Sequence, residues 1–273
     1  MNNQSFTSWR SVLIGAILIP LNSHWHIQMT LVWLTNFPAI LTLLFNVIFI
    51  LLLLVVCNHF WARYSPKTSL RQSELLTVYT MLCTSTALCG YDMMQCLVSL
   101  MGTGTWYATH ENEWITLFSH HLPDWLVVKD IEVLTPFYNG ESNFYSSRYL
   151  SAWAIPIVCW TVFVILLIWV MLCINVLLRK QWIEHERLAY PIVELPYDMT
   201  TVDKSASKKR DSLLTNRRLW VGLSISGGIG LLNGFSYLYP SVPSIPIWVT
   251  SINQLATTKP WNAISSMNIT LYP

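Results

Sequence analysis

The stretch AWAIPIVCWTVFVILLIWVMLCINVLL, residues 152–178, contains no charged side chain. A helix needs about 20 apolar residues to cross a hydrocarbon core about 30 Å thick. This stretch is therefore long enough to span a membrane, and PAILTLLFNVIFILLLLVVC, residues 38–57, is a second such run. Three less apolar stretches are also long enough, namely 11–34, 73–101 and 219–238. The sequence thus predicts an all-α fold, a polytopic transmembrane helix bundle with about five spans.

The composition agrees with a membrane protein. Hydrophobic residues make up 53% of the 273 residues and charged residues only 11%, whereas soluble domains carry about 25% charged residues. All the cysteines lie in apolar stretches, which favours free thiols over a disulfide framework or a zinc site; they are Cys57, Cys83, Cys89, Cys96, Cys159 and Cys173.

The basic residues predict the orientation of the spans. Thirteen of the 16 Lys and Arg residues lie before the first span, between the second and third, or between the fourth and fifth. Loops rich in Lys and Arg stay in the cytoplasm. We therefore expect a cytoplasmic N-terminus, an outer loop over 102–151 that contains one or two short surface helices, and an inner loop over 179–218.

Span 73–101 has one polar helical face. Packing between helices explains its serines and threonines as well as a solute pathway does. Asp92 is the stronger candidate, because ionisable groups within a membrane are by default functional candidates. The face covers an arc of about 140° at 100° per residue, and its members include the predicted substrate- or ion-pathway residues Thr84, Asp92 and Gln95.

Span 11–34 carries polar residues on two sides. Pro20 is expected to kink the helix, and broken helices are how many transporters build a site near the middle of the membrane. The polar residues that follow are the remaining pathway candidates Asn22, His24, His26 and Gln28. Solvation of the histidines at the outer interface is an equal alternative. Our sharpest hypothesis is that Asp92 and His24 or His26 flank the outer part of a polar cavity and bind a cation or a proton.

Enzyme chemistry has little support in the sequence. Phosphate-binding glycine loops, nucleophile elbows and kinase motifs are absent from the 273 residues, and the histidines of the outer loop lack a tight metal-ligand motif. We expect a protein that is not an enzyme, with no cofactor, no metal site and no nucleic-acid partner.

Five short motifs resemble, in the same order, those of a large bacterial family of multi-pass membrane proteins without an assigned function. They are LIPLN (18–22), NVIFILL (46–52), ENEW with LPDWL (111–126), MLCINVLLRKQW (171–182) and ERLAYPI (186–192). The resemblance covers essentially the whole chain and implies a location in the bacterial inner (plasma) membrane.

A more distant resemblance is to the N-terminal part of the oligopeptide transporter superfamily, whose members move peptides or metal chelates. It rests on ERLAYPIVELPYDM (186–199), RSVLIGAILIPLNSHWHIQM (10–29) and SELLTVYTMLCTSTALCG (73–90). It implies that Glu186, Tyr190 and Pro191 form an ordered inner elbow leading into a short helix. Pro191 also disfavours helical geometry at Tyr190, and Pro196 is expected to break a helix in turn. A plain cytoplasmic loop is the alternative.

Together these features predict a single transmembrane domain over residues 1–273, the N-terminal part of a longer, transporter-like protein. The expected function is secondary transport of a small solute such as a peptide or a metal chelate. The alternative is a structural or accessory subunit of a larger membrane complex. The expected partners are the lipid bilayer, the solute, and either a second copy of the chain or the C-terminal half of the same protein.

Overall fold

The computed structural model describes residues 8–33, 43–66, 68–140, 143, 145–186, 191–201, 217–239, 241–245, 248–249 and 269–270. It divides into two compact units, Met1–Thr200 and Thr201–Pro273.

Helices are the regular elements of the first unit in its described residues. In chain order its elements are α1 (Trp9–Ile27), η1 (Gln28–Val32), α2 (Phe45–Tyr64), α3 (Gln72–Cys89), η2 (Tyr91–Gln95), α4 (Cys96–Trp106), α5 (Trp114–Leu117), η3 (Ser119–His121), α6 (Ile131–Asn139), α7 (Ser147–Lys180), η4 (Gln181–His185) and α8 (Pro191–Thr200). The η1, η2 and η4 segments are π-helical, and η3 is a 3₁₀ turn.

The second unit contains α9 (Arg217–Leu238) and two strands of two residues each, β1 (Trp248–Val249) and β2 (Ile269–Thr270), which pair antiparallel. Asn233 of α9 holds the segment that follows the helix: its Nδ2 donates to the carbonyl of Ile245, and its Oδ1 accepts from the backbone N–H of Ile245, both at 2.8 Å. The predicted all-α class is confirmed, because so short a strand pair leaves the architecture helical.

Three helices in the described part of the chain are long and apolar enough to cross a membrane. They are α2, the continuous helix of α7 and η4 (Ser147–His185), and α9. The side chains of α7 are exposed over most of its length, as suits a helix surrounded by lipid. The second predicted span is displaced along the chain, because α2 begins at Phe45 rather than at residue 38; residues 38–42 lie outside the described part.

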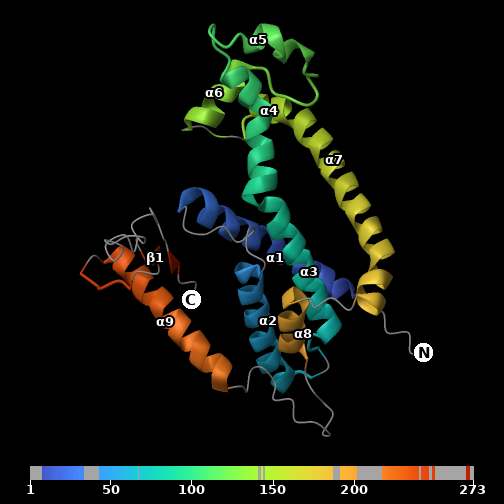
Figure 1. Ribbon diagram of the computed structural model, residues 1–273, viewed down its shortest axis with the longest axis vertical. Helices are drawn as coiled ribbons and strands as arrows, with labels where there is room; N and C mark the ends of the chain where they lie inside the picture. The colour runs from blue at the N-terminus through green and yellow to red at the C-terminus, as the bar shows by residue number, and fades with distance from the viewer. Residues whose placement is uncertain are drawn as a thin grey trace, which may run out of the picture. The chain divides into compact units, whose positions relative to one another are not determined.

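Helices α1, α2 and α3 form an up-down-up bundle (Figure 1). At the N-terminal end of α1, Ser8 donates to the carboxylate of Glu74, and Arg10 Nη2 donates to the carbonyl of Thr68 at 2.6 Å. At the other end, Gln95 Nε2 donates to Thr30 Oγ1 at 2.9 Å. The start of α1 thus lies beside the start of α3, and the residues that follow α1 lie beside those that follow α3. Helix α1 therefore runs parallel to α3.

One face of α1 is buried against α3. Its buried residues recur at the helical spacing expected for one stripe: Ser11, Gly15, Asn22, His26, Met29 and Thr30. A Cβ atom at Gly15 would lie only 2.6 Å from Met81 Sδ. The absence of a side chain there lets the two helices approach closely.

The third predicted span is interrupted. Gly90 has φ −63° and ψ 161°, an extended conformation, so α3 ends and the π-helical segment η2 begins. The expectation of one continuous helix over 73–101 is therefore wrong. In contrast, α1 continues through Pro20, and the kink expected there stays a prediction. Glycine weakens a helix because its backbone loses more conformational freedom there than that of other residues. Proline in a membrane helix is tolerated when neighbouring groups bond to the backbone carbonyl that it leaves without a donor.

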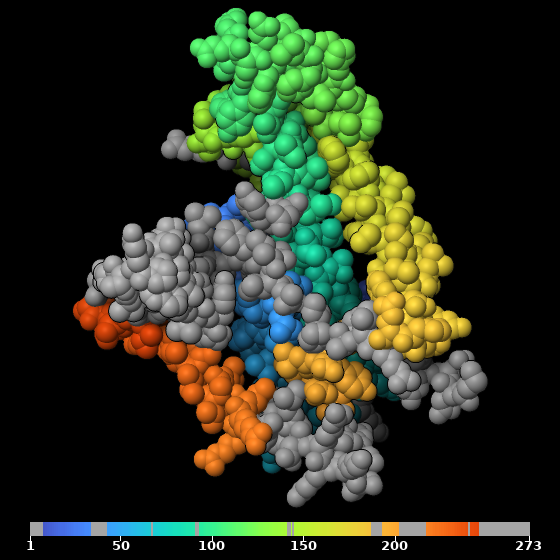
Figure 2. Space-filling view, viewed as in Figure 1, coloured from blue at the N-terminus to red at the C-terminus, as the bar shows by residue number. Residues whose placement is uncertain are grey.

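Residues 96–140 and the first turns of α7 form a small packed body, which we call the cap (Figure 2). Its core consists of Met101, Val128, Val133, Leu134 and Trp153. Short helices were expected within 102–151, and the structure has α5 and α6 there; α4 ends at Trp106, and turns follow up to the four-residue α5. The Trp106 ring stacks on Tyr138 of α6 at a centroid distance of 5.0 Å.

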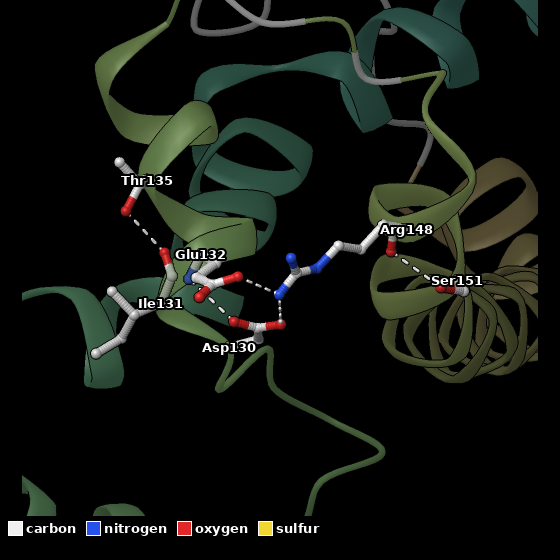
Figure 3. A network of polar contacts seen from close by, with 6 residues as sticks. All are labelled: Asp130, Ile131, Glu132, Thr135, Arg148 and Ser151. Atoms are coloured by element: carbon white, nitrogen blue, oxygen red, sulfur yellow. Dashed lines mark hydrogen bonds and ion pairs between the residues drawn. The ribbon is translucent and has the colours of Figure 1, made fainter.

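Arg148 joins the start of α7 to the start of α6 (Figure 3). Its Nη2 lies 3.2 Å from Asp130 Oδ2 and 2.5 Å from Glu132 Oε2. Asp130 also caps α6, since its Oδ1 accepts from the backbone N–H of Glu132 at 2.9 Å. Slight desolvation would raise the pKa of Asp130, but the hydrogen bonds from Arg148 and Glu132 outweigh it, so this pKa lies below its ordinary value.

Helix α8 packs against α2 and α3 near the turn that joins them. It begins at Pro191, a position that suits proline because the first helical N–H has no partner. Gln72 Nε2 donates to the carbonyl of Tyr197 at 3.5 Å. Pro196 is buried inside the helix, so the expectation that it would break a helix here is wrong.

Candidate functional site

Three side chains from three helices meet at the centre of the bundle. Asn22 of α1, Asn46 of α2 and Thr86 of α3 are all completely buried. Asn22 Nδ2 donates to Thr86 Oγ1 at 2.8 Å, and Asn46 Nδ2 donates to Asn22 Oδ1 at 2.8 Å and to Thr86 Oγ1 at 3.0 Å. We call this group the amide triangle.

A second polar group lies two helical turns further along α1, where the two π-helical segments meet. Thr30 of η1 donates to the carbonyl of His26 at 2.9 Å and accepts from Gln95 Nε2 of η2. The same Gln95 nitrogen donates to the carbonyl of Cys89 at 3.2 Å, just before the Gly90 break. π-helical bulges are frequent at functional sites. The direct hydrogen bond between two such segments therefore makes this part of the bundle a candidate functional site.

His26 lies between the two groups on the same buried stripe. Its side chain is completely buried, and in the described part of the chain neither ring nitrogen has a hydrogen-bond partner. Asn46 Oδ1 and Gln95 Oε1 are likewise buried without a partner among the described residues. Four unsatisfied polar atoms thus occur within one short section of the bundle, although burying such a group without a hydrogen bond costs roughly 1–3 kcal/mol.

Two serines and a cysteine lie beside these polar groups. Ser23 and Ser85 hydroxyl oxygens are 3.1 Å apart, and Cys89 Sγ donates to Ser23 Oγ at 3.3 Å. Together with the amide triangle, His26, Thr30 and Gln95, these residues form what we call the polar row. Its described members carry no carboxylate, and the described residues contain no group of three or more His, Cys, Asp or Glu side chains that could hold a metal ion.

The structure brings together three of the seven pathway candidates that were predicted from the sequence. Asn22, His26 and Gln95 belong to the polar row. His24 is exposed on another face of α1, and Gln28 is half-buried. The side chain of Asp92 lies outside what the structure describes, so the hypothesis that pairs it with a histidine stays a prediction.

Thr84 is exposed, and its hydroxyl donates to the carbonyl of Thr80 at 3.0 Å. Thr80 in turn donates to the carbonyl of Thr77 at 2.9 Å. The hydroxyl groups of these threonines donate to backbone carbonyls of their own helix, as those of Ser and Thr often do. The expected polar face of span 73–101 is therefore buried only in part: Thr80 and Thr84 are exposed, whereas Ser85 of the same face is buried beside Thr86.

Sequence reasoning missed Asn46, Thr30 and Thr86. Thr86 carries no signal of its own, because a threonine in a helix often bonds to its own backbone. Asn46 did carry a signal, since it is the single amide side chain in the otherwise apolar run that begins the second span.

The proposed inner elbow is described in part. Glu186 is exposed at the end of η4, where Gln181 Nε2 donates to its carboxylate at 3.4 Å. Tyr190 lies outside the described residues, and Pro191 is the first residue of α8.

The chain was compared with known proteins. One family model, described as "Family of unknown function (DUF6785)", matches residues 1–273. No curated protein and no solved structure matches the chain.

Proposed function

Because the chain belongs to this family of unknown function, we propose from its own chemistry that it acts as a secondary transporter, or as the N-terminal half of one. The solute is a small polar molecule such as a peptide or a metal chelate. It passes along a pathway that α1, η1, α3 and η2 line.

The proposal includes five membrane spans. Besides the three apolar helices, it assigns α1 with η1, which is about 36 Å long at 1.5 Å per residue, and the interrupted helix from α3 to α4. Both are less apolar than the other spans, as befits helices that contribute to a polar interior. Buried polar stripes on both and the length of each support this assignment.

We further propose that the protein lies in the inner membrane with its N-terminus in the cytoplasm. The contacts of Ser8 with Glu74 and of Arg10 with Thr68 support a common side for the N-terminus and the α2–α3 turn. The basic residues of these segments and of 179–218 favour the cytoplasm for that side. The cap then lies outside, and α8 lies at the inner face.

The observation that carries the transport proposal is the set of unsatisfied atoms in the polar row. A row of polar groups that served only to hold helices together would gain from closing every bond. His26, Asn46 Oδ1 and Gln95 Oε1 instead remain available to a ligand, a proton or water. The interruption of the helix at Gly90 lies beside them, as in transporters with broken helices.

The amide triangle supports the second candidate, a structural or accessory subunit. Its three side chains bond to one another, and such bonds hold membrane helices together. Under this alternative the polar row stays dry, and the exposed helices bind a second copy of the chain or a C-terminal half.

Cysteine accessibility distinguishes the two candidates. Cys89 lies on the polar row, while Cys173 lies on the exposed surface of α7. We would retain one native cysteine at a time, replace the other five with serine or alanine, and treat membranes with a water-soluble thiol reagent. We expect Cys89 to react and Cys173, which faces lipid, to stay unmodified; labelling after denaturation verifies both variants.

A Cys89 that reacts only after denaturation would favour the structural subunit. A second assay reconstitutes the chain in proteoliposomes and measures uptake of labelled peptides and metal chelates. Gln95→Met should reduce any uptake by at least about tenfold, since it removes the bond between the two π-helical segments.

A further inference from the structure

We infer that His26 is a proton-binding site, in which the imidazolium donates one ring N–H to Asn46 Oδ1 and the other to Gln95 Oε1. The binding site itself is independent of transport. Its role in coupling a proton to solute movement rests on the proposed function.

The orientation of the Gln95 amide follows from its partners. Its nitrogen donates to the carbonyl of Cys89, which can only accept, and to Thr30 Oγ1, whose own hydrogen goes to the carbonyl of His26. The nitrogen therefore cannot exchange places with the oxygen. Gln95 Oε1 is a buried oxygen that can only accept.

Asn46 presents a second acceptor. Its nitrogen makes two bonds within the amide triangle, to Asn22 Oδ1 and to Thr86 Oγ1. Its oxygen makes none among the described residues.

The bonds along α1 place His26 between these acceptors. Asn22 holds Asn46 four residues before His26, and Thr30 holds Gln95 four residues after it. Residues four apart lie on one helix face, about 6 Å apart along the axis. The ring therefore has one acceptor on each side, and a rotation of the side chain or one bridging water on each side closes the two bonds.

Counting donors and acceptors favours a proton over other small ligands. A neutral imidazole has one N–H and one acceptor nitrogen, so it satisfies one amide oxygen and leaves one ring nitrogen without a donor. The imidazolium has two N–H groups and satisfies both oxygens. An alkali cation would bind the two oxygens but leave the histidine without a partner.

Among the titratable groups whose side chains the structure describes, His26 is the principal site. From α3, Cys89 is the nearest described group, and Glu74 lies twelve residues before Thr86, about 18 Å away along the helix, where it accepts from Ser8. On α2, the described groups Cys57, His59 and Arg63 lie in the half of the helix opposite Asn46. On α1, His24 is exposed and Arg10 lies at the far end; from η2, Asp92 has a side chain outside the described part. Desolvation opposes the imidazolium while the two hydrogen bonds stabilise it, which suits reversible proton binding.

The test is ¹⁵N nuclear magnetic resonance of the whole chain, labelled at histidine, in lipid nanodiscs. The ring nitrogen shifts report protonation directly, and His26→Asn identifies the His26 signals. We expect His26 to become an imidazolium with two hydrogen-bonded N–H groups between about pH 8 and pH 5.

Two substitutions at Gln95 then test the acceptor. Gln95→Met removes it and should lower the midpoint of the His26 titration by about one pH unit, because a hydrogen bond to a charged group is worth about a tenfold change in the equilibrium. Gln95→Glu replaces it with a stronger acceptor and should raise the midpoint by at least as much. His24→Asn is the matched control on the exposed face of α1 and should leave the midpoint unchanged.

A His26 that stays a single neutral tautomer over the whole range would overturn the inference, and so would a midpoint that neither Gln95 variant moves. If Gln95→Met fails to fold, Gln95→Glu decides alone. If His26 titrates as expected but a pH gradient drives no uptake in proteoliposomes, then the transport proposal fails and the proton site stands.

Discussion

One hydroxyl oxygen joins three helices in this protein. Thr86 of α3 accepts from an amide of α1 and from an amide of α2, and all three side chains are completely buried. Without the hydroxyl, two buried N–H groups lose an acceptor that neither lipid nor the neighbouring apolar side chains can replace.

We therefore expect Thr86→Val, which keeps the shape of the side chain, to lower the free energy of unfolding by about 1–2 kcal/mol. Unfolding by sodium dodecyl sulfate in mixed micelles, followed by circular dichroism, measures this quantity. The matched control is Thr84→Val two residues earlier, whose exposed hydroxyl donates to the carbonyl of Thr80 on its own helix; it should change stability by less than about 0.5 kcal/mol. Equal effects of the two substitutions would contradict the importance of the amide triangle.

Residue types predicted a third of the polar row. Asn22, His26 and Gln95 were found because amides and imidazoles are rare inside membrane helices, so each attracts notice by itself. Thr86 could not be found in this way. A threonine can satisfy its hydroxyl on its own backbone, and only the packing of α1 against α3 decides that Thr86 turns inward while Thr84 does not.

At the scale of single elements, helix interruptions proved harder to predict than helices. Helices occur in all five predicted spans, because long apolar stretches suffice to predict them. The interruption lies at Gly90 and not at Pro20, since the outcome depends on which freed backbone groups find partners in the neighbouring helices. In the cap, the sequence predicts short helices but not how they pack, because the core residues of the cap come from segments far apart in the sequence.

The contact between α4 and α6 depends on a glycine. A Cβ at Gly102 would lie 2.5 Å from Leu134 Cδ2, and Leu134 is completely buried in the core of the cap. Gly102→Ala should therefore lower the stability of the cap by about 1–3 kcal/mol through overpacking. Hydrogen–deuterium exchange of residues 128–139 would show the loss as faster exchange.

The control for this prediction is Gly104→Ala in the same helix. A Cβ there would lie 3.5 Å from Phe118, an ordinary contact, and alanine favours a helix over glycine by about 1 kcal/mol. We expect unchanged or slower exchange. If residues 128–139 exchange at the same rate in both variants, the close packing of Gly102 against Leu134 does not determine the stability of α6.

At the scale of the whole molecule, the orientation in the membrane is the strongest remaining prediction from the sequence. Two independent features agree on it: the basic residues favour one side for the N-terminus and the α2–α3 turn, and the contacts of Ser8 and Arg10 join these two segments.

We expect fusions of reporter proteins after Ser69 and after Glu111 to give opposite signals. A green fluorescent protein should fluoresce after Ser69, in the α2–α3 turn, while alkaline phosphatase should be active after Glu111, in the cap. Both reporters are fused at both sites, so each site controls the other. The same reporter responding at both sites would place the turn and the cap on one side and reject the five-span assignment.

The amide triangle also constrains how the protein is made. Its first and last members are 64 residues apart in the chain, which corresponds to roughly 3–13 s of synthesis at about 5–20 residues per second. Late in that interval Asn22, His26 and Asn46 have been synthesised, but the helix that supplies Thr86 is still incomplete. Release of α1 and α2 into lipid would leave three polar side chains facing hydrocarbon. Under the five-span assignment proposed above, we therefore expect the insertion machinery to hold the first two helices until the third arrives, so that the three enter the bilayer together.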